Sequence, residues 1–163
     1  MSSPNPYSPP VARVSDIHPA GDSPPIWNPR AAANWSLLFS PIFGALVQMK
    51  NWQALGEPDR AATSRNWAIG SVFFFVAMTL VAVVAPDSKA VDGLTRLLGL
   101  VLLVVWYYAN GKSQHAYVLG RFGTTYKKKG WGIPLLWAVA GLVGFVVAMV
   151  LVGVALGMAG AGG

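Results

Sequence analysis

The longest run of residues without a charge constrains this chain more than any other feature of its sequence. It covers residues 131–163, and its most apolar part, residues 133–157, is 25 residues long. A bilayer core offers no partners for open backbone groups, so segments that cross it are helices or closed barrels. Barrel strands alternate apolar and polar residues, and this run does not. The sequence therefore predicts an all-α membrane protein in which residues 133–157 form a spanning helix.

Two shorter apolar runs predict two more spanning helices. Residues 67–85 carry no charge, and 19 residues at 1.5 Å each extend about 28 Å, close to the roughly 30 Å of the hydrocarbon layer. Because Pro58 suits a first helical position, this helix is expected to begin before it enters the membrane. Residues 94–111 form the next span, with the Arg96 side chain extending its charge to the headgroups. A short polar loop joins these two spans into a hairpin.

The segment before these spans is too polar for an ordinary membrane crossing. Residues 31–49 are uncharged but contain several polar side chains, and Pro41 removes a helical hydrogen bond near their middle. We expect a kinked interfacial or re-entrant helix with its kink at Pro41, and a true first span is the alternative. Residues 1–30 hold eight of the 12 prolines and predict a disordered tail, so that residues 31–163 form the helical membrane domain.

The position of the positive charge predicts the orientation. Of the net charge of +6, the greatest part lies in residues 110–130, which carry five Lys and Arg residues and no acid, whereas residues 86–96 carry two of each sign. Loops rich in Lys and Arg stay in the cytoplasm. We therefore expect a cytoplasmic N-terminal tail and a C-terminus on the opposite side of the membrane, which is the periplasm where the membrane is the inner membrane of a bacterium. No recognition motif accompanies the charge, which argues against nucleic-acid binding.

Aromatic and basic residues gather at the ends of the predicted spans, where side chains contact lipid headgroups. The expected interfacial anchors are Trp35, Trp52, Trp67, Trp106, Tyr107, Tyr108 and Trp131. The expected contacts of the basic loop are Arg121, Lys127, Lys128 and Lys129. On a helical wheel Val118, Leu119, Phe122 and Tyr126 share one side, and Gln114, Arg121, Thr125 and Lys128 share the other. Either these charges only fix the topology, or an amphipathic helix binds anionic headgroups.

The sequence offers no constellation of catalytic or metal-binding residues. It contains no cysteine and only two histidines, His18 and His115, whereas a metal site needs three or four ligands that converge. A P-loop, a GxSxG motif and paired carboxylates within a span are all absent from it. Ion pathways need ionisable groups at membrane depth, and the sequence supplies none at the centre of a span. We predict a non-enzymatic protein with no catalytic residue, metal site or cofactor.

Glycines of the last span predict close helix packing. Nine of the 18 glycines fall in residues 130–163, and Gly153 and Gly157 form a GxxxG motif that lets two helix backbones approach closely. The predicted packing residues are Gly141, Gly144, Gly153 and Gly157. They would pack against the preceding hairpin or against another protein, and both alternatives remain open.

Two stretches of the sequence are similar to those of a known group of proteins. The first contains Trp35, Phe39, Pro41 and Phe43-Gly44, and the second runs from Tyr107 to Gly111, followed by Ala116-Tyr117 and the basic residues. Over about residues 31–130 the chain resembles a family of small multi-pass bacterial inner-membrane proteins, classed as a domain of unknown function, with a Trp-x-x-x-Phe-x-Pro-x-aromatic-Gly box at the membrane entry. The resemblance implies an architecture and brings no activity.

These features together predict a non-enzymatic inner-membrane interaction protein, either an accessory subunit or a scaffold. It would act through helix–helix and lipid-headgroup contacts, and its partners would be the bilayer and a membrane protein or a second copy of itself. An immunity protein that neutralises a membrane-inserting bacterial toxin is one alternative. A small transporter or channel assembled as a homo-oligomer is the other.

Overall fold

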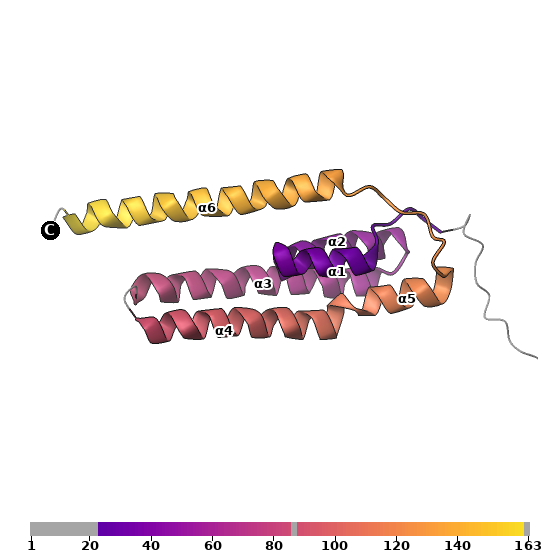
Figure 1. Ribbon diagram of the computed structural model, residues 1–163, viewed down its shortest axis with the longest axis horizontal. Helices are drawn as coiled ribbons and strands as arrows, with labels where there is room; N and C mark the ends of the chain where they lie inside the picture. The colour runs from indigo at the N-terminus through magenta and orange to yellow at the C-terminus, as the bar shows by residue number, and fades with distance from the viewer. Residues whose placement is uncertain (1–22, 86–87, 162–163) are drawn as a thin grey trace, which may run out of the picture.

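The computed structural model describes residues 23–85 and 88–161 (Figure 1). Within this part of the chain the fold is helical apart from turns and one isolated bridge. The elements are α1 (Pro29–Leu38), α2 (Pro41–Ala54), α3 (Pro58–Val84), α4 (Lys89–Trp106), the π-helical turn η2 (Tyr107–Gly111), α5 (Ser113–Phe122) and α6 (Gly132–Ala161). Most of the predicted disordered tail, residues 1–22, lies outside the described residues.

Three helical segments are long and apolar enough to cross a membrane. They are Pro58–Val83, Lys89–Phe122 and Gly132–Ala155. The prediction of an all-helical chain with three helices of spanning character is confirmed over the described residues. Helices α3 and α4 both begin before the predicted spans. Pro58 occupies the first position of α3. Ser88 caps α4, because its Oγ accepts a hydrogen bond from the Val91 N–H at 3.3 Å.

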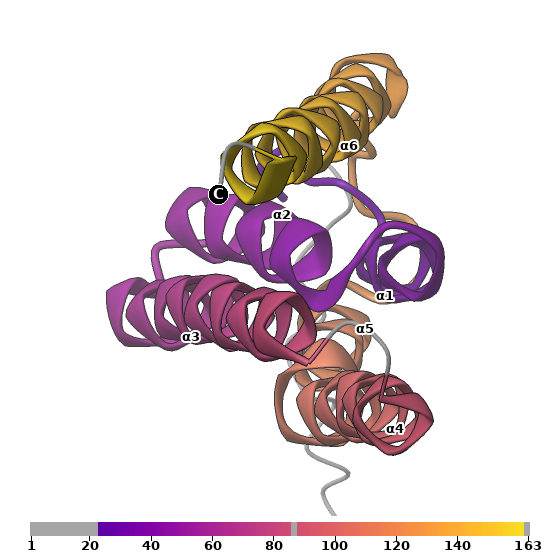
Figure 2. The same ribbon diagram turned by 90° about the vertical axis from the view of Figure 1, so that its left-hand side faces the viewer.

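The prediction of one helix kinked at Pro41 is wrong. The chain forms two helices, α1 and α2, which double back on each other at Phe39–Ser40 (Figures 1 and 2). Pro41 occupies the first position of α2, where its missing N–H costs nothing, and Ser40 caps that helix by accepting from the Phe43 N–H at 3.3 Å. With 10 and 14 residues, the two helices extend only about 15 and 21 Å, so neither crosses a hydrocarbon layer of roughly 30 Å alone.

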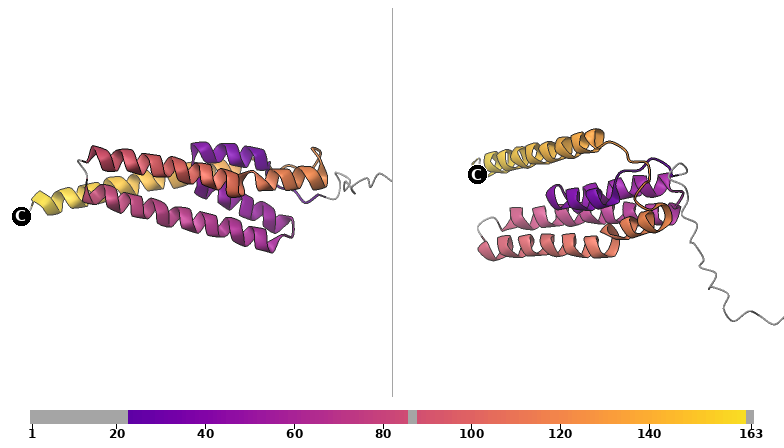
Figure 3. Two further views of the ribbon diagram at one scale, coloured as in Figure 1. Left: turned by 90° about the horizontal axis from the view of Figure 1, so that it is seen from below. Right: turned by 45° about the vertical axis from the view of Figure 1, so that its right-hand side comes forward.

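Helices α4 and α5 form one long segment interrupted by η2. Here the Lys112 N–H donates to the Tyr107 carbonyl, five residues earlier, at 3.0 Å. Such π-helical turns are inserted where packing or function needs a changed register. Beyond η2, α5 continues past the end of α4 towards the loop that leads to α6 (Figure 3). We call this end of the molecule, with α5 and residues 123–131, the basic end.

The segment before α1 is placed against the basic end, which differs from the predicted disorder up to residue 30. The Ile26 N–H donates to the Lys127 carbonyl at 3.1 Å, and the Lys129 N–H donates to the Ile26 carbonyl at 2.8 Å. Ile26 itself is fully buried with Val118, Phe122 and Tyr126. Residues 23–28 therefore fasten the start of α1 to the loop before α6.

Helix α6 stands apart from the other helices. In Figure 2 it forms one layer, α1 and α2 form the next, and α3 and α4 form the third. Pro134 is its one buried residue among those whose burial the structure describes, and Trp137 is 73% exposed. A helix that is apolar on all sides and not covered by its own chain requires lipid or another helix around it.

Candidate functional site

Polar side chains are buried where the α1–α2 hairpin meets the rest of the bundle. They are Gln48 and Asn51 on α2, Ser64 on α3, Asn110 in η2 and Gln114 on α5. Gln48, Asn51, Ser64 and Gln114 have no exposed surface, and Asn110 is 4% exposed. A buried amide costs free energy unless its donors and acceptors find partners, so the hydrogen bonds of this cluster decide its role.

The first half of the cluster joins α2 to the π-helical turn. Gln48 Nε2 donates to the Gly111 carbonyl at 2.7 Å, and Asn110 Nδ2 donates to Gln48 Oε1 at 2.7 Å. Ser64 adds longer contacts of 3.4 Å to the Asn110 amide. The Gln48 amide thus binds the backbone and a side chain of the π-helical turn at the same time.

The second half of the cluster joins α2 to α5 and to the N-terminal segment. Asn51 pairs with the backbone of Trp27 in both directions: its Oδ1 accepts from the Trp27 N–H at 2.9 Å, and its Nδ2 donates to the Trp27 carbonyl at 2.8 Å. The same Nδ2 contacts Gln114 Oε1 at 2.9 Å. Gln114 Nε2 in turn donates to the Gln48 carbonyl at 2.9 Å.

The amides of the cluster therefore bind one another and the backbone. The three side chains at its centre, Gln48, Asn110 and Gln114, each use both ends of the amide within the protein. Among the described residues no group of three His, Cys, Asp or Glu side chains could hold a metal ion. The arrangement acts as a polar seam that holds the hairpin against α3, η2 and α5.

Trp106 packs beside this seam and not at the lipid headgroups. It is fully buried together with Ala45 and Ala68, so the predicted interfacial role is wrong for this residue. Gly44 makes room for the indole: a Cβ there would lie 2.6 Å from the ring and 1.8 Å from Ser36 Oγ. The indole fills the close approach of α2 to α4, and hydropathy alone did not distinguish it from a tryptophan that faces lipid.

The other predicted anchors fall into two groups. Trp52 is 1% exposed, so the predicted interfacial role is wrong here as well, because its ring packs edge-on against Tyr117 at 5.0 Å between centroids. The remaining predicted anchors have at least part of their surface open: Trp35, Trp67, Tyr107 and Trp131 are half-buried, and Tyr108 is exposed. The headgroup role of these residues stays a prediction.

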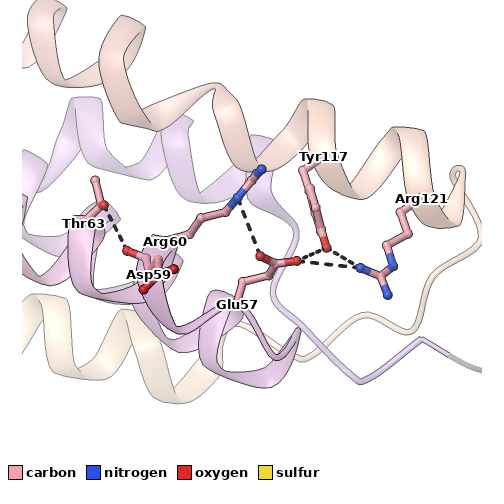
Figure 4. A network of polar contacts seen from close by, with 6 residues as sticks. All are labelled: Glu57, Asp59, Arg60, Thr63, Tyr117 and Arg121. Carbon is pink, nitrogen blue, oxygen red and sulfur yellow. Dashed lines mark hydrogen bonds and ion pairs between the residues drawn. The ribbon is translucent and has the colours of Figure 1, made fainter.

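A charged cluster lies at the turn between α2 and α3 (Figure 4). The Tyr117 hydroxyl donates to Glu57 Oε1 at 2.5 Å, and Arg121 reaches both groups, with its Nη1 3.7 Å from the same carboxylate oxygen. Arg60 approaches the other oxygen of Glu57 at 3.8 Å and lies over the rings of Trp52 and Tyr117. Arg121 was predicted as a headgroup contact, and the structure adds an intramolecular partner in Glu57, the residue before α3.

The lysines of the basic end lie against aromatic rings. Lys128 Nζ is 5.3 Å from the ring centre of Tyr126, and Lys129 Nζ is 4.5 Å from that of Trp27. The Trp27 indole also donates to the Gly130 carbonyl at 2.9 Å. Lys127 and Lys128 are exposed and Lys129 is half-buried. The ammonium groups of Lys128 and Lys129 are therefore held near these two rings.

The amphipathic face of α5 differs in part from the helical wheel. Val118 and Phe122 are buried as expected, but Leu119 is 45% exposed. The helix ends at Phe122, so the expected amphipathic helix does not extend to Thr125, Tyr126 and Lys128; Tyr126 is buried from the loop that follows. Gln114, expected on the polar side, is fully buried in the seam. The wheel gives only the direction of each side chain around the helix axis. The hairpin supplies the amide partners that make burial of Gln114 favourable.

Three of the four predicted packing glycines on α6 have open space where a side chain would begin. A Cβ added at Gly141, Gly144 or Gly153 would meet nothing within 4 Å. The surroundings of Gly157 lie outside the description, although its backbone is helical. The three described glycines therefore do not serve close packing against the preceding hairpin, which was one of the two alternatives.

An apolar groove separates α6 from α2 and α3. Its wider part has a volume of about 430 Å³ and is lined by Phe39, Phe43, Phe75, Trp137, Gly141 and Phe145 among others. A second hollow of about 380 Å³ shares Ile42, Phe75 and Phe145 with the first and continues along α6 to Val152. The groove is open at the side and almost entirely apolar.

Sequence reasoning missed the polar seam. A signal was present: Gln48 and Asn51 are three residues apart, and Asn110 and Gln114 are four apart, so each pair shares one helix face. Two amide pairs on faces of otherwise apolar helices indicate contact between those helices, because each pair supplies the partners that the other needs.

Comparison with protein-family models, with curated proteins and with solved structures found no match to this chain. The fold therefore defines its class: an all-helical chain with three helices able to cross a membrane and a helical hairpin too short to cross. That class is compatible with a multi-pass membrane protein.

Proposed function

We propose that this chain is a non-enzymatic scaffold or accessory subunit of the bacterial inner membrane, which binds a second membrane protein along α6. The observation that carries the proposal is the open surface of α6 around Gly153, where a Cβ would meet nothing within 4 Å. Glycine lets two helix backbones come close enough for dispersion and weak hydrogen bonds to hold them. Within the described part of the chain, no other helix packs closely against α6 at Gly153.

The basic end supports a cytoplasmic orientation. Lys127, Lys128 and Lys129 are clustered beside the start of α6, and the N-terminal segment holds their loop in place. Lys and Arg residues beside a span favour the cytoplasmic side, and each adds about 1 kcal/mol of attraction to an anionic leaflet. The loop between α3 and α4 and the end of α6 would then face the periplasm.

Crosslinking inside native membranes tests the proposal. A photoreactive amino acid replaces Val150, which is 59% exposed and lies near Gly153 on α6; the control position is Val101 on α4, which is 46% exposed. We expect one discrete adduct from Val150 and none from Val101. Gly153→Leu should abolish the adduct, because the added side chain blocks close approach, whereas Gly70→Leu on α3, also at an open glycine, should leave it intact.

The identity of the adduct separates the alternatives. An unrelated membrane protein supports a scaffold or accessory subunit, and a membrane-inserting toxin would identify the immunity form of the same binding. An adduct between two copies, together with solute flux through the purified protein in liposomes, would replace the proposal with a transporter. No adduct at all would overturn it.

A further inference from the structure

We propose that the groove between α6 and helices α2 and α3 binds one anionic glycerophospholipid, with an acyl chain along the groove and the headgroup at Lys127–Lys129. The inference rests on the proposed function, since it names the lipid that the basic end would contact. It concerns a different face of α6 from the protein-binding surface around Gly153.

The groove has the size and lining for a single hydrocarbon chain. Its wider part of about 430 Å³ falls within the range of roughly 300–1,000 Å³ found for small-molecule pockets. From Trp137 to Val152 its α6 wall extends about 22 Å, more than one leaflet of roughly 15 Å.

A row of aromatic rings connects the groove to the basic end. Trp131, the residue before α6, lies 6.5 Å from Trp35 between ring centroids. Trp35 lies 5.9 Å from Phe39, and Phe39 lies 5.4 Å from Phe43. Phe39 and Phe43 line the groove. The row therefore passes from the polar end, where tryptophan prefers the headgroup region, to the apolar interior.

Charge complementarity selects the kind of lipid. Residues 110–130 contain five basic residues and no acid, and only Gly130 separates the lysines at 127–129 from Trp131. Lys128 and Lys129 lie against the rings of Tyr126 and Trp27, which limits their movement while their charges stay available. A phosphodiester with a net negative charge fits this end, and a zwitterionic headgroup gains less.

The two proposed surfaces of α6 are separate. Gly141 and Phe145 face the groove, four residues apart. Phe145 lies near the middle of the groove-lining side; at about 100° per residue Gly153 is turned by roughly 80° from it and Val150 by roughly 140°. A lipid in the groove therefore leaves the side of α6 that carries Val150 free for a protein, with Gly153 at its edge.

Photoreactive lipids test this inference on the full-length chain. The protein is reconstituted in vesicles of phosphatidylcholine and phosphatidylglycerol in equal parts, with a trace of either lipid carrying a diazirine near the end of its acyl chain. We expect phosphatidylglycerol to crosslink to peptides of α2, α3 and α6 that contain groove residues. Phosphatidylcholine should crosslink there roughly tenfold less, because it lacks the net charge that the lysines attract.

Two variants and a matched control separate the two halves of the site. Gly141→Leu places a side chain in the groove without meeting another atom near its Cβ, and it should remove the groove adduct. Gly144→Leu makes the same change at an open glycine that does not line the groove, and it should retain the adduct. Replacing Lys127, Lys128 and Lys129 by Gln should make the two lipids crosslink equally.

Equal crosslinking of both lipids by the unaltered protein would overturn the inference, as would adducts spread evenly over the outer faces of α3, α4 and α6. A groove adduct that survives Gly141→Leu would do the same. Closure of α6 onto α2 and α3 would appear as the absence of any groove adduct. If the Val150 crosslink to a partner persists in that case, the proposed function stands and only the lipid site fails.

Discussion

Asn110 donates its side-chain amide to Gln48 Oε1 at 2.7 Å, across 62 residues of sequence. This hydrogen bond joins the α1–α2 hairpin to the π-helical turn between α4 and α5. It is buried, and the Gln48 amide also satisfies the Gly111 carbonyl. The hairpin is therefore attached to the long helices by polar contacts as well as by packing.

A double-mutant cycle on Gln48 and Asn110 should measure this attachment. Gln48→Ala leaves the Gly111 carbonyl and the Asn110 amide without their partner, and a buried unsatisfied group costs about 1–3 kcal/mol. The coupling energy between the two substitutions should be about 0.5–2 kcal/mol, as between hydrogen-bonded side chains of membrane proteins. Reversible unfolding in mixed micelles gives these values. Gln53→Ala, on the exposed side of α2, is the control and should change stability little.

Gly44 should tolerate no side chain. A Cβ at this position would lie 1.8 Å from Ser36 Oγ and within 2.8 Å of the Trp106 ring, so Gly44→Ala must displace the indole or open the hairpin. Overpacking of this kind costs about 1–3 kcal/mol. Gly70→Ala on α3 meets nothing within 4 Å and should not lower stability. Equal melting temperatures for the two variants in detergent would contradict the packing of Trp106 against Gly44.

The charged cluster at the α2–α3 turn should contribute modestly. Tyr117→Phe keeps the ring below Arg60 but removes the hydroxyl that bonds Glu57, at a cost of about 0.5–1.5 kcal/mol. Glu57→Gln removes the charge that attracts Arg60 and Arg121, and its cost of up to about 1 kcal/mol should shrink as salt is raised. Unfolding at low and high salt measures both. Tyr108→Phe, at an exposed tyrosine, should have no effect.

The spanning helices could be predicted from sequence because hydropathy over some 20 residues is a local property. The start of a new helix at Pro41 could not be predicted in this way, because a proline within an apolar run either kinks a helix or begins a new one. The choice depends on Ser40 as a cap and on Gly44, whose lack of a side chain lets α2 approach Ser36 and Trp106.

The candidate site was predicted only in part for a similar reason. The positive charge of a lysine is a property of that residue alone, so the accumulation of charge at the basic end could be predicted. The polar seam depends on pairs such as Gln48 with Asn110 and Asn51 with Gln114, which are more than 60 residues apart in the chain. The sequence around Trp52 and Trp106 is like that around interfacial tryptophans. Only the folded structure shows that other side chains bury the two rings.

Alkaline pH should loosen the basic end. Burial raises the pKa of the Tyr126 phenol above its usual value of 10.0. A raised pKa in the folded state means that the stabilising contribution is complete below about pH 10 and is lost as the pH rises through the folded value. Tyr126→Phe keeps the ring and cannot ionise, so its stability should fall less than that of the unaltered protein between about pH 9 and 11.

Single-cysteine labelling should show that the α1–α2 hairpin enters and leaves the membrane on one side. The chain has no cysteine, so each introduced thiol is unique. Arg30→Cys and Ala54→Cys mark exposed positions at the two ends of the hairpin, and Thr124→Cys marks the basic loop. All three should react with an impermeant maleimide only after the inner side is opened, because positive loops stay in the cytoplasm.

Ser88→Cys, at the turn between α3 and α4, should instead react from outside intact cells. Ser40→Cys lies at the tip of the hairpin, about 15 Å along α1 from Pro29, and should react slowly from either side. A true first span would put Arg30 and Ala54 on opposite sides, so labelling of Arg30→Cys from outside would contradict the re-entrant hairpin. Labelling of Thr124→Cys from outside would instead reverse the orientation of the whole protein, and Lys127–Lys129 would then face the outer leaflet.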